Sequence, residues 1–345
     1  RRIGIQPDII ICRSDQPISE GTRDKISLFC DVAQEAVISL PTVPTIYEIP
    51  LLLEETGLGQ LIVDKLCLKA NQPDLSQWQE LVNGIKTTHE PVNIALVGKY
   101  VELQDAYFSV REALHHAALY HDRGINLLWI HSEDLEKNDS DSPLRSAQGI
   151  IVPGGFGIRG IEGMVEAVSY ARNNEIPYLG LCLGMQVMVI EFARYAMSST
   201  QPNSTEFDAS TPYPVIDLLP DQKAIENKGG TMRLGNYPCH MVKGTHAATA
   251  YGQELVDERH RHRFEFNNQF RTQLEEAGLV YSGLSPDGQL VEICELANHP
   301  WMVSCQFHPE FGSHLGHPHP LFRDFIGVAK DVLREGVQPS LPLSS

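Results

Sequence analysis

Apolar and polar residues recur along the middle of the chain with two periods, which predict short buried strands separated by amphipathic helices. The predicted strands are residues 93–98, 125–131, 148–153 and 177–181. The predicted helices are residues 108–120, 164–172 and 185–195. Short apolar strands that alternate with helices predict an α/β fold with a mostly parallel sheet flanked by helices on both faces.

The same alternation occurs nearer the N-terminus, where it predicts the end of a separate α/β unit. Its predicted strands are 8–13 and 36–39, and its predicted helices are 21–29 and 45–55. Residues 57–91 are rich in Gly, Pro, Asn and Gln and hold one short amphipathic stretch around Trp78. The pattern therefore predicts an N-terminal part, 1–69, a linker, 70–91, a larger α/β domain, 92–335, and a tail, 336–345.

The C-terminal third carries a weaker pattern. Residues 198–245 are polar and rich in Gly, Pro, Asn and Ser, which predicts long functional loops. Apolar segments at 279–284, 290–296 and 302–307 predict further strands, and 321–333 predicts a last helix.

Composition narrows the class of protein. The 345 residues include 27 Lys and Arg against 44 Asp and Glu, a net charge of −17, which argues against binding a nucleic acid polymer. No apolar run approaches the ~20 residues that span a bilayer, and no signal-peptide pattern opens the chain. Seven scattered cysteines without a C-x-x-C pair indicate a reduced, cytoplasmic protein. Because Arg1 lies so close to a buried strand, we expect the chain to be part of a longer parent.

The strongest local motif is Gly180-Leu181-Cys182-Leu183-Gly184, between a predicted strand and a predicted helix. This G-x-C-x-G pattern is typical of a nucleophile elbow, in which a tight turn exposes the side chain. The following helix N-terminus favours the thiolate, the reactive form of cysteine. A buried core cysteine between two packing glycines is the alternative.

A base for this cysteine is available in Gln306-Phe307-His308-Pro309-Glu310. In extended chain, His308 and Glu310 point to the same side, so the carboxylate could accept the Nδ1 proton and leave Nε2 for the thiol. A loop histidine beside a solvated acid is the alternative.

The run from Pro153 to Gly160 contains G-x-G-x-x-G at Gly155, Gly157 and Gly160, which raises the possibility of a dinucleotide site. That fingerprint belongs on the first strand of its fold, whereas this is the third strand of its domain, and the next strand lacks the acidic residue that would bind the ribose. We instead expect the N–H groups of Gly155 and Leu183 to form an oxyanion hole, with a plain tight turn as the alternative.

Two other motifs do not support a site. His260 and His262, and the later trio His314, His317 and His319, lack a recognised zinc spacing, so we expect no metal site. Val97-Gly98-Lys99 resembles the end of a P-loop but lacks its first glycine and its Ser or Thr.

The elbow, the H-x-E motif and the Gly154-Gly155 turn together resemble the class I glutamine amidotransferases. Longer strings are similar to the CTP synthase family: VPGGFGIRGIEGM at 152–164, YLGLCLGMQ at 178–186, NSTEF at 203–207, GGTMRLG at 229–235, ERHRHRFEFNN at 258–268, CQFHPEF at 305–311, PDIIICRSD at 7–15 and KISLFC at 25–30. The last two resemble the end of that family's P-loop-type synthetase domain, so residues 1–69 are expected to be its C-terminal remnant.

The resemblance implies a glutaminase with Cys182 as nucleophile, His308 as base and acid, and Glu310 orienting the histidine. The positions that match the family's glutamine site are Gly155, Leu183, Gly184, Met185, Gln186, Glu206 and Arg263. From charge, Glu206 suits the substrate ammonium group and Arg263 its polar end.

The resemblance also implies nucleotide ligands. Arg13 and Lys25 match residues that contact the UTP or CTP phosphates, and Pro41-Thr42-Val43 matches a segment that contacts ATP. Family members often carry Lys-Asp-Val at these three positions. Phe156 and Arg159 are candidates for the GTP effector.

The family uses ATP and Mg²⁺ to phosphorylate UTP, which ammonia from glutamine then converts to CTP. Its P-loop and Mg²⁺-binding acids precede the segment seen here, so we expect a complete glutaminase that cannot phosphorylate UTP by itself. By resemblance, the protein is a homotetramer.

Two alternatives are a glutaminase that serves another synthetase, or a γ-glutamyl hydrolase, and a non-catalytic regulatory amidotransferase-like module. GGTMRLG and ERHRHRFEFNN argue against the first, and the presence of Cys182, His308 and Glu310 argues against the second.

Overall fold

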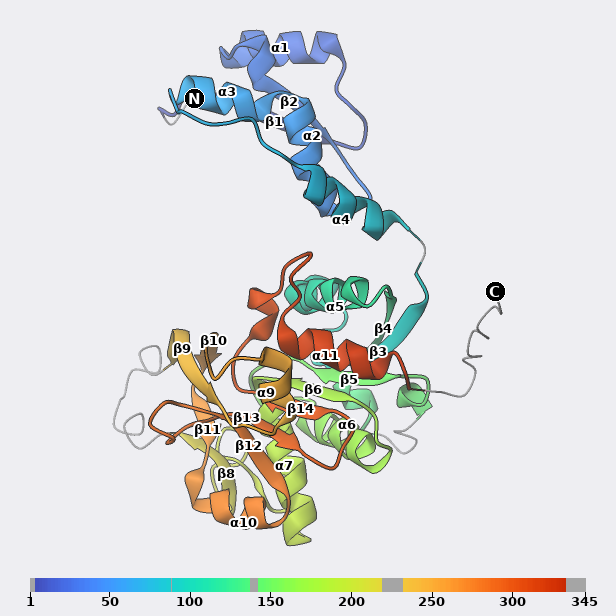
Figure 1. The fold of residues 1–345 in the computed structure, drawn as a ribbon, viewed down its shortest axis with the longest axis vertical. Coiled ribbons are helices and arrows are strands. Elements are labelled where there is room, and N and C mark those ends of the chain that lie inside the picture. The colour runs from blue at the N-terminus through green and yellow to red at the C-terminus, as the bar shows by residue number, and fades with distance from the viewer. Residues whose placement is uncertain (1–3, 88, 137–141, 219–231, 333–345) are drawn as a thin grey trace. The chain divides into compact units, whose positions relative to one another are not determined.

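The computed structural model describes residues 4–87, 89–136, 142–218 and 232–332. The chain divides into two compact units, residues 1–87 and 88–345 (Figure 1). The tail predicted at 336–345 lies outside the described residues.

The N-terminal unit is built on two parallel strands, β1 and β2, joined through helix α1. Its elements are β1 Ile10–Ser14, α1 Glu20–Cys30, β2 Val37–Pro41, α2 Ile49–Glu55, α3 Leu58–Lys65 and α4 Ser76–Lys86. The hydroxyl of Ser19 caps α1 by accepting a hydrogen bond from the N–H of Thr22. The two strands and the helix between them form the α/β unit that the pattern predicts.

Helix α4 lies inside the stretch predicted as a linker and is held to the N-terminal unit. The indole Nε1 of Trp78 donates a hydrogen bond of 2.8 Å to the carbonyl of Tyr47, and the two rings lie 6.1 Å apart. Helix α3 was not predicted, because Gly57 and Gly59 interrupt its apolar pattern. Gly57 has φ of 77°, a conformation that favours glycine, and α3 begins directly after it.

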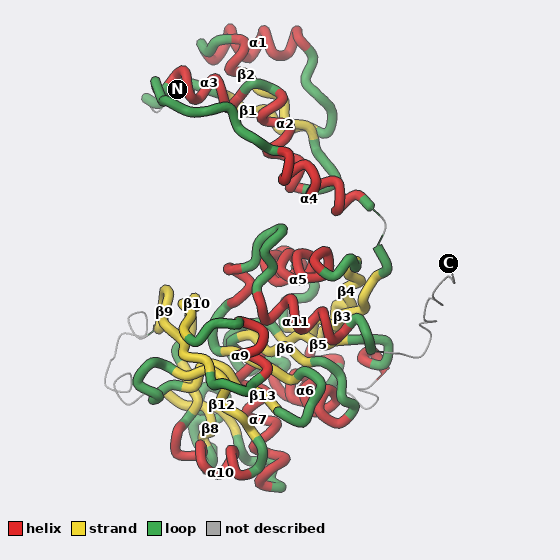
Figure 2. The backbone as a smooth tube through the Cα atoms, in the orientation of Figure 1, coloured by secondary structure: helices red, strands yellow, loops and turns green. Residues whose placement is uncertain are grey.

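The C-terminal unit contains a nine-stranded sheet in the order β10-β9-β12-β13-β14-β6-β5-β3-β4 (Figure 2). Five neighbouring strands are parallel: β14 Met302–Cys305, β6 Tyr178–Leu181, β5 Gly149–Val152, β3 Pro91–Gly98 and β4 Gly124–His131. The other four extend the sheet in antiparallel fashion: β13 Val291–Leu296, β12 Leu279–Leu284, β9 Arg233–Met241 and β10 Leu255–His262.

Helices cover both faces of this sheet (Figure 1). One face carries α5 Phe108–Tyr120, α9 His246–Tyr251 and α11 Pro320–Ala329, and the other carries α6 Ile161–Asn173 and α7 Leu183–Met197. Along β3 the side chains alternate between the two cores: Ile94 and Leu96 pack with the first set of helices, and Ala95 and Val97 with the second. The predicted fold class, an α/β fold with a mostly parallel sheet flanked by helices, is confirmed.

A small three-stranded sheet lies beyond the large one. It consists of β11 Phe264–Phe266, β8 Pro214–Leu218 and β7 Asn203–Ser204, and a short helix, α10 Arg271–Glu276, follows it. Strands β7, β8 and β9 all lie within residues 198–245, which were predicted to be loops. Most residues of β9 are exposed or half-buried, and its sequence has no apolar run that would indicate a strand. Between β10 and β11, Arg263 marks the point where the chain leaves one sheet for the other.

Candidate active site

Cys182 occupies a sharp turn between β6 and α7. Its backbone has φ of 52° and ψ of −98°, a conformation that residues with a side chain rarely adopt. The flanking glycines make the turn possible: a Cβ on Gly184 would meet the carbonyl oxygen of Val152 at 2.1 Å, and one on Gly180 would meet the backbone of Gly184 at 2.7 Å. The G-x-C-x-G sequence therefore forms a strained elbow.

His308 and Glu310 come from the segment that follows β14, the strand next to β6. The Nδ1 atom of His308 lies 2.8 Å from Oε1 of Glu310, and the Glu310 side chain is buried. Burial lowers the pKa of His308, but the interactions with Cys182 and Glu310 outweigh it and raise the pKa to about 10. The imidazole is therefore held in its charged form beside the cysteine.

Gly154 lies close to both His308 and Cys182. A Cβ placed on Gly154 would lie 2.9 Å from Cε1 of His308 and 3.6 Å from Cβ of Cys182. Cys182, His308 and Glu310 line one cavity of about 310 Å³, which is large enough for an amino acid. Other residues that line this cavity are Tyr107, Gly155, Phe156, Arg261 and Phe311.

The loop after β5 carries Gly155 up to the first turn of α7. A Cβ on Gly155 would meet Cδ2 of Leu183 at 3.1 Å, so the two residues are packed against each other. Leu183 is the first residue of α7, where backbone N–H groups have no partner within the helix. This is the pair of N–H groups that the sequence predicts as an oxyanion hole.

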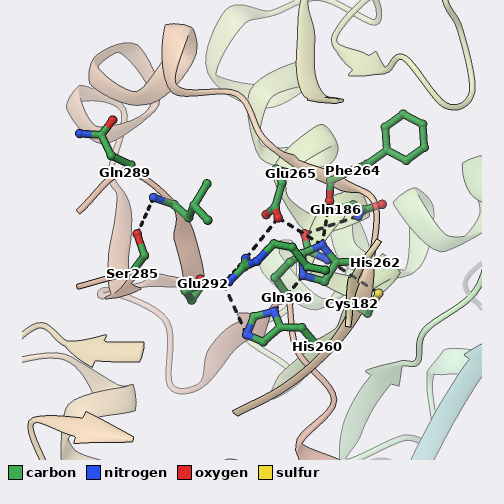
Figure 3. Close-up of polar contacts among 12 residues, drawn as sticks. Cys182, Gln186, His260, His262, Phe264, Glu265, Ser285, Gln289, Glu292 and Gln306 are labelled. Atoms are coloured by element: carbon green, nitrogen blue, oxygen red, sulfur yellow. Dashed lines mark hydrogen bonds and ion pairs between the residues drawn. The ribbon is translucent and has the colours of Figure 1, made fainter. Parts of the chain in front are cut away.

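Two glutamine side chains lead from the cysteine to the β10–β11 corner (Figure 3). The amide nitrogen of Gln306 lies 3.7 Å from the sulfur of Cys182. The amide nitrogen of Gln186 donates to the side-chain oxygen of Gln306 at 3.4 Å and to the carbonyl of Phe264 at 3.3 Å. Gln186 was predicted as a substrate contact, whereas no role was predicted for Gln306.

Lys99 anchors the glycine loop, and sequence reasoning missed it. Its ammonium group donates hydrogen bonds to the carbonyls of Phe156 and Gly157, and the N–H of Gly157 donates to Glu206 at 2.9 Å. Burial lowers the pKa of Lys99 to about 8, although nearby Glu206 opposes this shift. The sequence signal that could have identified Lys99 is its position directly after a buried strand, at the sheet edge that carries the glycine loop.

Gly155 lines the cavity, whereas the other predicted glutamine-site residues are not among those that line it and lie in neighbouring segments. Gly184 and Met185 are buried in the first turn of α7. Arg263 is half-buried between β10 and β11, next to the Phe264 carbonyl that Gln186 binds. Glu206 is half-buried and is brought to the glycine loop by its hydrogen bond with Gly157.

The two candidate effector residues lie beside the same loop. Phe156 is half exposed at the cavity. Arg159 donates a hydrogen bond of 2.9 Å to the carbonyl of Lys99, and its guanidinium lies 5.7 Å from the centre of the Tyr100 ring. Both are therefore accessible near the candidate oxyanion hole.

The predicted nucleotide contacts all belong to the N-terminal unit. They are Arg13, Lys25, Pro41, Thr42 and Val43. The N–H of Thr42 donates to the carbonyl of Ser14 at 2.9 Å, so segment 41–43 lies beside the end of the strand that carries Arg13. Lys25 is exposed on α1.

Comparison with known proteins identifies two family matches in this chain. Residues 102–328 match the family Glutamine amidotransferase class-I, and residues 1–68 match the family CTP synthase N-terminus.

Curated relatives match over the whole chain. The chain is 65% identical over 344 residues to a CTP synthase of Dehalococcoides mccartyi, and the match covers 100% of this chain and 63% of that protein. It is 58% identical to a CTP synthase of Roseiflexus sp., covering 99% of this chain and 62% of that protein. The chain thus spans less than two thirds of the length of these relatives.

A solved structure, the Trypanosoma brucei CTPS glutaminase domain with bound acivicin, matches with a TM-score of 0.66 and 36% identity. The match covers 70% of this chain and 96% of that one. In the part of the chain that the structure describes, no helix is both long and apolar enough to span a bilayer.

Proposed function

The chain belongs to the class I glutamine amidotransferase family, in its CTP synthase branch, and we propose that its C-terminal unit hydrolyses glutamine through Cys182, His308 and Glu310. The observation that carries this proposal is the arrangement of the three side chains around one cavity, with the cysteine on a strained elbow. A merely structural cysteine has no need of such a backbone conformation or of a charged histidine partner.

The first half of the reaction forms a thioester. The sulfur of Cys182 attacks the side-chain carbonyl carbon of glutamine, and the negative oxygen that develops is stabilised by the N–H groups of Gly155 and Leu183. His308 then donates a proton to the leaving nitrogen, which departs as ammonia. The raised pKa of His308 suits this acid role, because the ring is protonated when the attack begins.

The second half releases glutamate. A water molecule attacks the γ-glutamyl thioester, with His308 now accepting a proton from the water, and a second oxyanion forms in the same place. Collapse of this intermediate expels the Cys182 thiolate and regenerates the site. Glu310 holds the imidazole ring through its contact with Nδ1 in both halves.

Substrate binding falls to charged and polar groups in the segments next to the cavity. We assign the α-ammonium group of glutamine to Glu206 and its carboxylate to Arg263, from charge complementarity. Gln186 lies between Cys182 and the corner that carries Arg263, which supports a role for it in binding the substrate side chain. Lys99 would act indirectly, by holding the glycine loop.

The direct test is covalent labelling of the purified chain with 6-diazo-5-oxo-L-norleucine, a glutamine analogue that alkylates nucleophilic cysteines. We expect a single adduct at Cys182, although Cys67 is the exposed cysteine and Cys182 is buried. Iodoacetamide, which lacks the amino acid part, should modify Cys67 readily and serves as the control. An adduct of the analogue at Cys67, or no adduct at all, would refute the proposal.

The synthetase half of the proposal concerns the whole protein of which such a unit is part. We propose that the ammonia released from glutamine at Cys182 serves the ATP-dependent amination of UTP to CTP, with GTP as effector and Mg²⁺ as the metal ion. Arg13 and segment 41–43 lie at the C-terminal ends of two neighbouring parallel strands, where α/β sheets bind ligands. Tetrameric assembly belongs to the same proposal.

A further inference from the structure

A buried group of charged side chains lies next to Gln186 and Gln306, on the side away from Cys182 (Figure 3). The guanidinium of Arg233, on β9, donates to Glu292 at 2.9 and 3.3 Å and to Glu265 at 3.2 Å. His260 and His262 complete the group, with 2.8 Å between Nδ1 of the first and Nε2 of the second. We call these five residues the Arg233 cluster.

The cluster is sealed from solvent, so its contacts cannot be replaced by water. The Arg233 side chain is 11% exposed, and the carboxylates of Glu265 and Glu292 are 2% and 0% exposed. A charge on either Glu265 or Glu292 disfavours a charge on the other, and Arg233 is the cation that lies between them. Removing one partner from a buried ionic group is strongly unfavourable, because the others stay buried without compensation.

The cluster meets the chain at the point where β10 ends and β11 begins. Arg233 lies directly opposite His262 in the β9–β10 ladder. Nδ1 of His262 lies 3.4 Å from Glu265 and 3.2 Å from the carbonyl of Phe264. Arg263 is therefore flanked by two residues, 262 and 264, that the cluster holds.

Hydrogen bonds also connect the β10–β11 corner with Cys182. The Phe264 carbonyl also accepts the hydrogen bond from Gln186, and Gln186 binds Gln306. The N–H of Gln306, in turn, donates to the carbonyl of Glu292 at 2.8 Å. Two sets of hydrogen bonds thus connect the Arg233 cluster with Gln186 and Gln306, beside Cys182.

We propose that Arg233 is a positioning residue for glutamine binding: by drawing Glu265 and Glu292 together it fixes the β10–β11 corner, and with it Arg263 and Gln186. Arg233 does not touch the substrate and takes no part in bond making. This inference rests on the proposed function, because it assumes that Arg263 and Gln186 face bound glutamine.

The experiment compares Arg233→Met with the unaltered chain, using the concentration dependence of labelling by 6-diazo-5-oxo-L-norleucine. We expect the half-saturating concentration to rise about tenfold or more while the maximal labelling rate changes less than about threefold, as for loss of binding alone. Alkylation of Cys182 by iodoacetamide should be unchanged, because that reagent has no amino acid part for Arg263 to bind. Arg233→Lys should give an intermediate half-saturating concentration, since one ammonium group cannot reproduce the fork that holds two carboxylates.

Arg172→Met is the matched control. Arg172 also makes a buried pair, with three hydrogen bonds of 2.7 to 3.2 Å to Glu191, but this pair lies between α6 and α7. Among the described residues, no hydrogen bond or ion pair joins it directly to the β10–β11 corner. Its half-saturating concentration should equal that of the unaltered chain.

The outcomes separate the two ideas. Failure of the unaltered chain to label at Cys182 would refute the proposed function itself. Normal labelling of that chain, with an unchanged half-saturating concentration in Arg233→Met, would overturn the positioning role. So would equal losses of analogue and iodoacetamide labelling, which would indicate a general disturbance. If Arg233→Met does not fold, Arg233→Lys carries the same comparison, and an unaltered half-saturating concentration in that variant overturns the role.

Discussion

His308 and Glu310 are joined by a contact of 2.8 Å between Nδ1 and Oε1, although the two residues are separated by a single proline. The 3-10 turn Pro309–Gly312 folds the carboxylate back to the ring. Because Nδ1 is engaged, the other ring nitrogen is left for the cysteine, and the pKa of the ring is raised to about 10. Orientation and basicity of the histidine therefore depend on one short turn.

Glu310→Gln should change the pH profile as well as the rate. The amide keeps the shape of the side chain but removes the charge that helps to raise the pKa of His308. The protonated ring is present below its pKa and is lost as pH rises through it, so the alkaline loss of glutaminase activity should move from near pH 10 to lower pH. The rate at neutral pH should fall about 10²-fold, the order of a general acid–base contribution. Hydrolysis of glutamine measured from pH 6 to 10.5 tests this, and an unmoved alkaline limb would contradict it.

Cys182→Gly should make the protein more stable than Cys182→Ala, while both variants lose glutaminase activity. Alanine retains the strain of φ at 52°, whereas glycine adopts such conformations freely. The relief of roughly 1–3 kcal/mol exceeds the ~0.4–1 kcal/mol that glycine costs through the unfolded chain, which leaves a gain of about 1 kcal/mol. Thermal denaturation should show a midpoint higher by about 2–4 °C for a unit of this size. Ala193→Gly, within α7, should lower the midpoint and serves as the control.

Gly184→Ala should disrupt the elbow. The added Cβ would lie 2.1 Å from the carbonyl oxygen of Val152, so β5 and α7 must move apart, at a cost of about 3 kcal/mol or more. Gly252→Ala is the control: its φ is 64°, but no atom lies within 4 Å of the new Cβ. That variant should lose only about 1 kcal/mol to backbone strain and keep its activity. Equal stability of the two variants in urea denaturation would show that the contact does not matter.

The elbow could be predicted because its requirements are local. Glycines at 180 and 184, a buried strand before Cys182 and a helix after it all lie within one stretch of sequence. The parallel half of the sheet could be predicted for the same reason, since each buried strand is itself a short apolar run.

The rest depends on contacts between segments that are distant in sequence. Strand β9 is largely polar and half-buried, and its position in the sheet is set by pairing with β10 and β12 rather than by its own pattern. The sequence raised the possibility that His260 and His262 bind a metal, whereas in the fold Arg233 lies opposite His262 on β9. Likewise the position of Lys99 after a buried strand indicates its edge of the sheet, but not that its ammonium group binds the carbonyl of Gly157.

Lys99→Met should slow glutamine hydrolysis without blocking alkylation of Cys182 by iodoacetamide. The lost hydrogen bonds to Phe156 and Gly157 release the loop that carries Gly155, so kcat should fall by about tenfold or more, in line with a weakened oxyanion hole. The pKa of Lys99 is about 8, so the unaltered protein loses the charge above that pH. The difference between the two proteins should therefore be smaller at pH 9 than at pH 7. Lys243→Met, at an exposed lysine, should leave kcat unchanged at both.

Glu265→Gln should make the protein less sensitive to alkaline pH. Burial raises the pKa of Glu265 to about 8, with Glu292 adding to the shift and Arg233 opposing it. In the unfolded chain the same carboxyl ionises near pH ~4.3. Between these values the folded protein keeps a proton that the unfolded chain has lost. The stability that this proton contributes is fully present below the unfolded pKa and declines as pH rises towards 8, by at most about 1.4 kcal/mol per pH unit.

A glutamine at position 265 keeps the acceptor oxygen for Arg233 and His262 but cannot ionise. The free energy of unfolding of Glu265→Gln, measured in urea from pH 5 to 9, should therefore rise relative to the unaltered protein between pH 5 and 8 and then stay constant. At pH 5 the two proteins should differ least, which is the internal control. A difference that does not change with pH would mean that Glu265 is already ionised at pH 5. Arg233 would then face a charged Glu265 side chain at pH 5 instead of a neutral one.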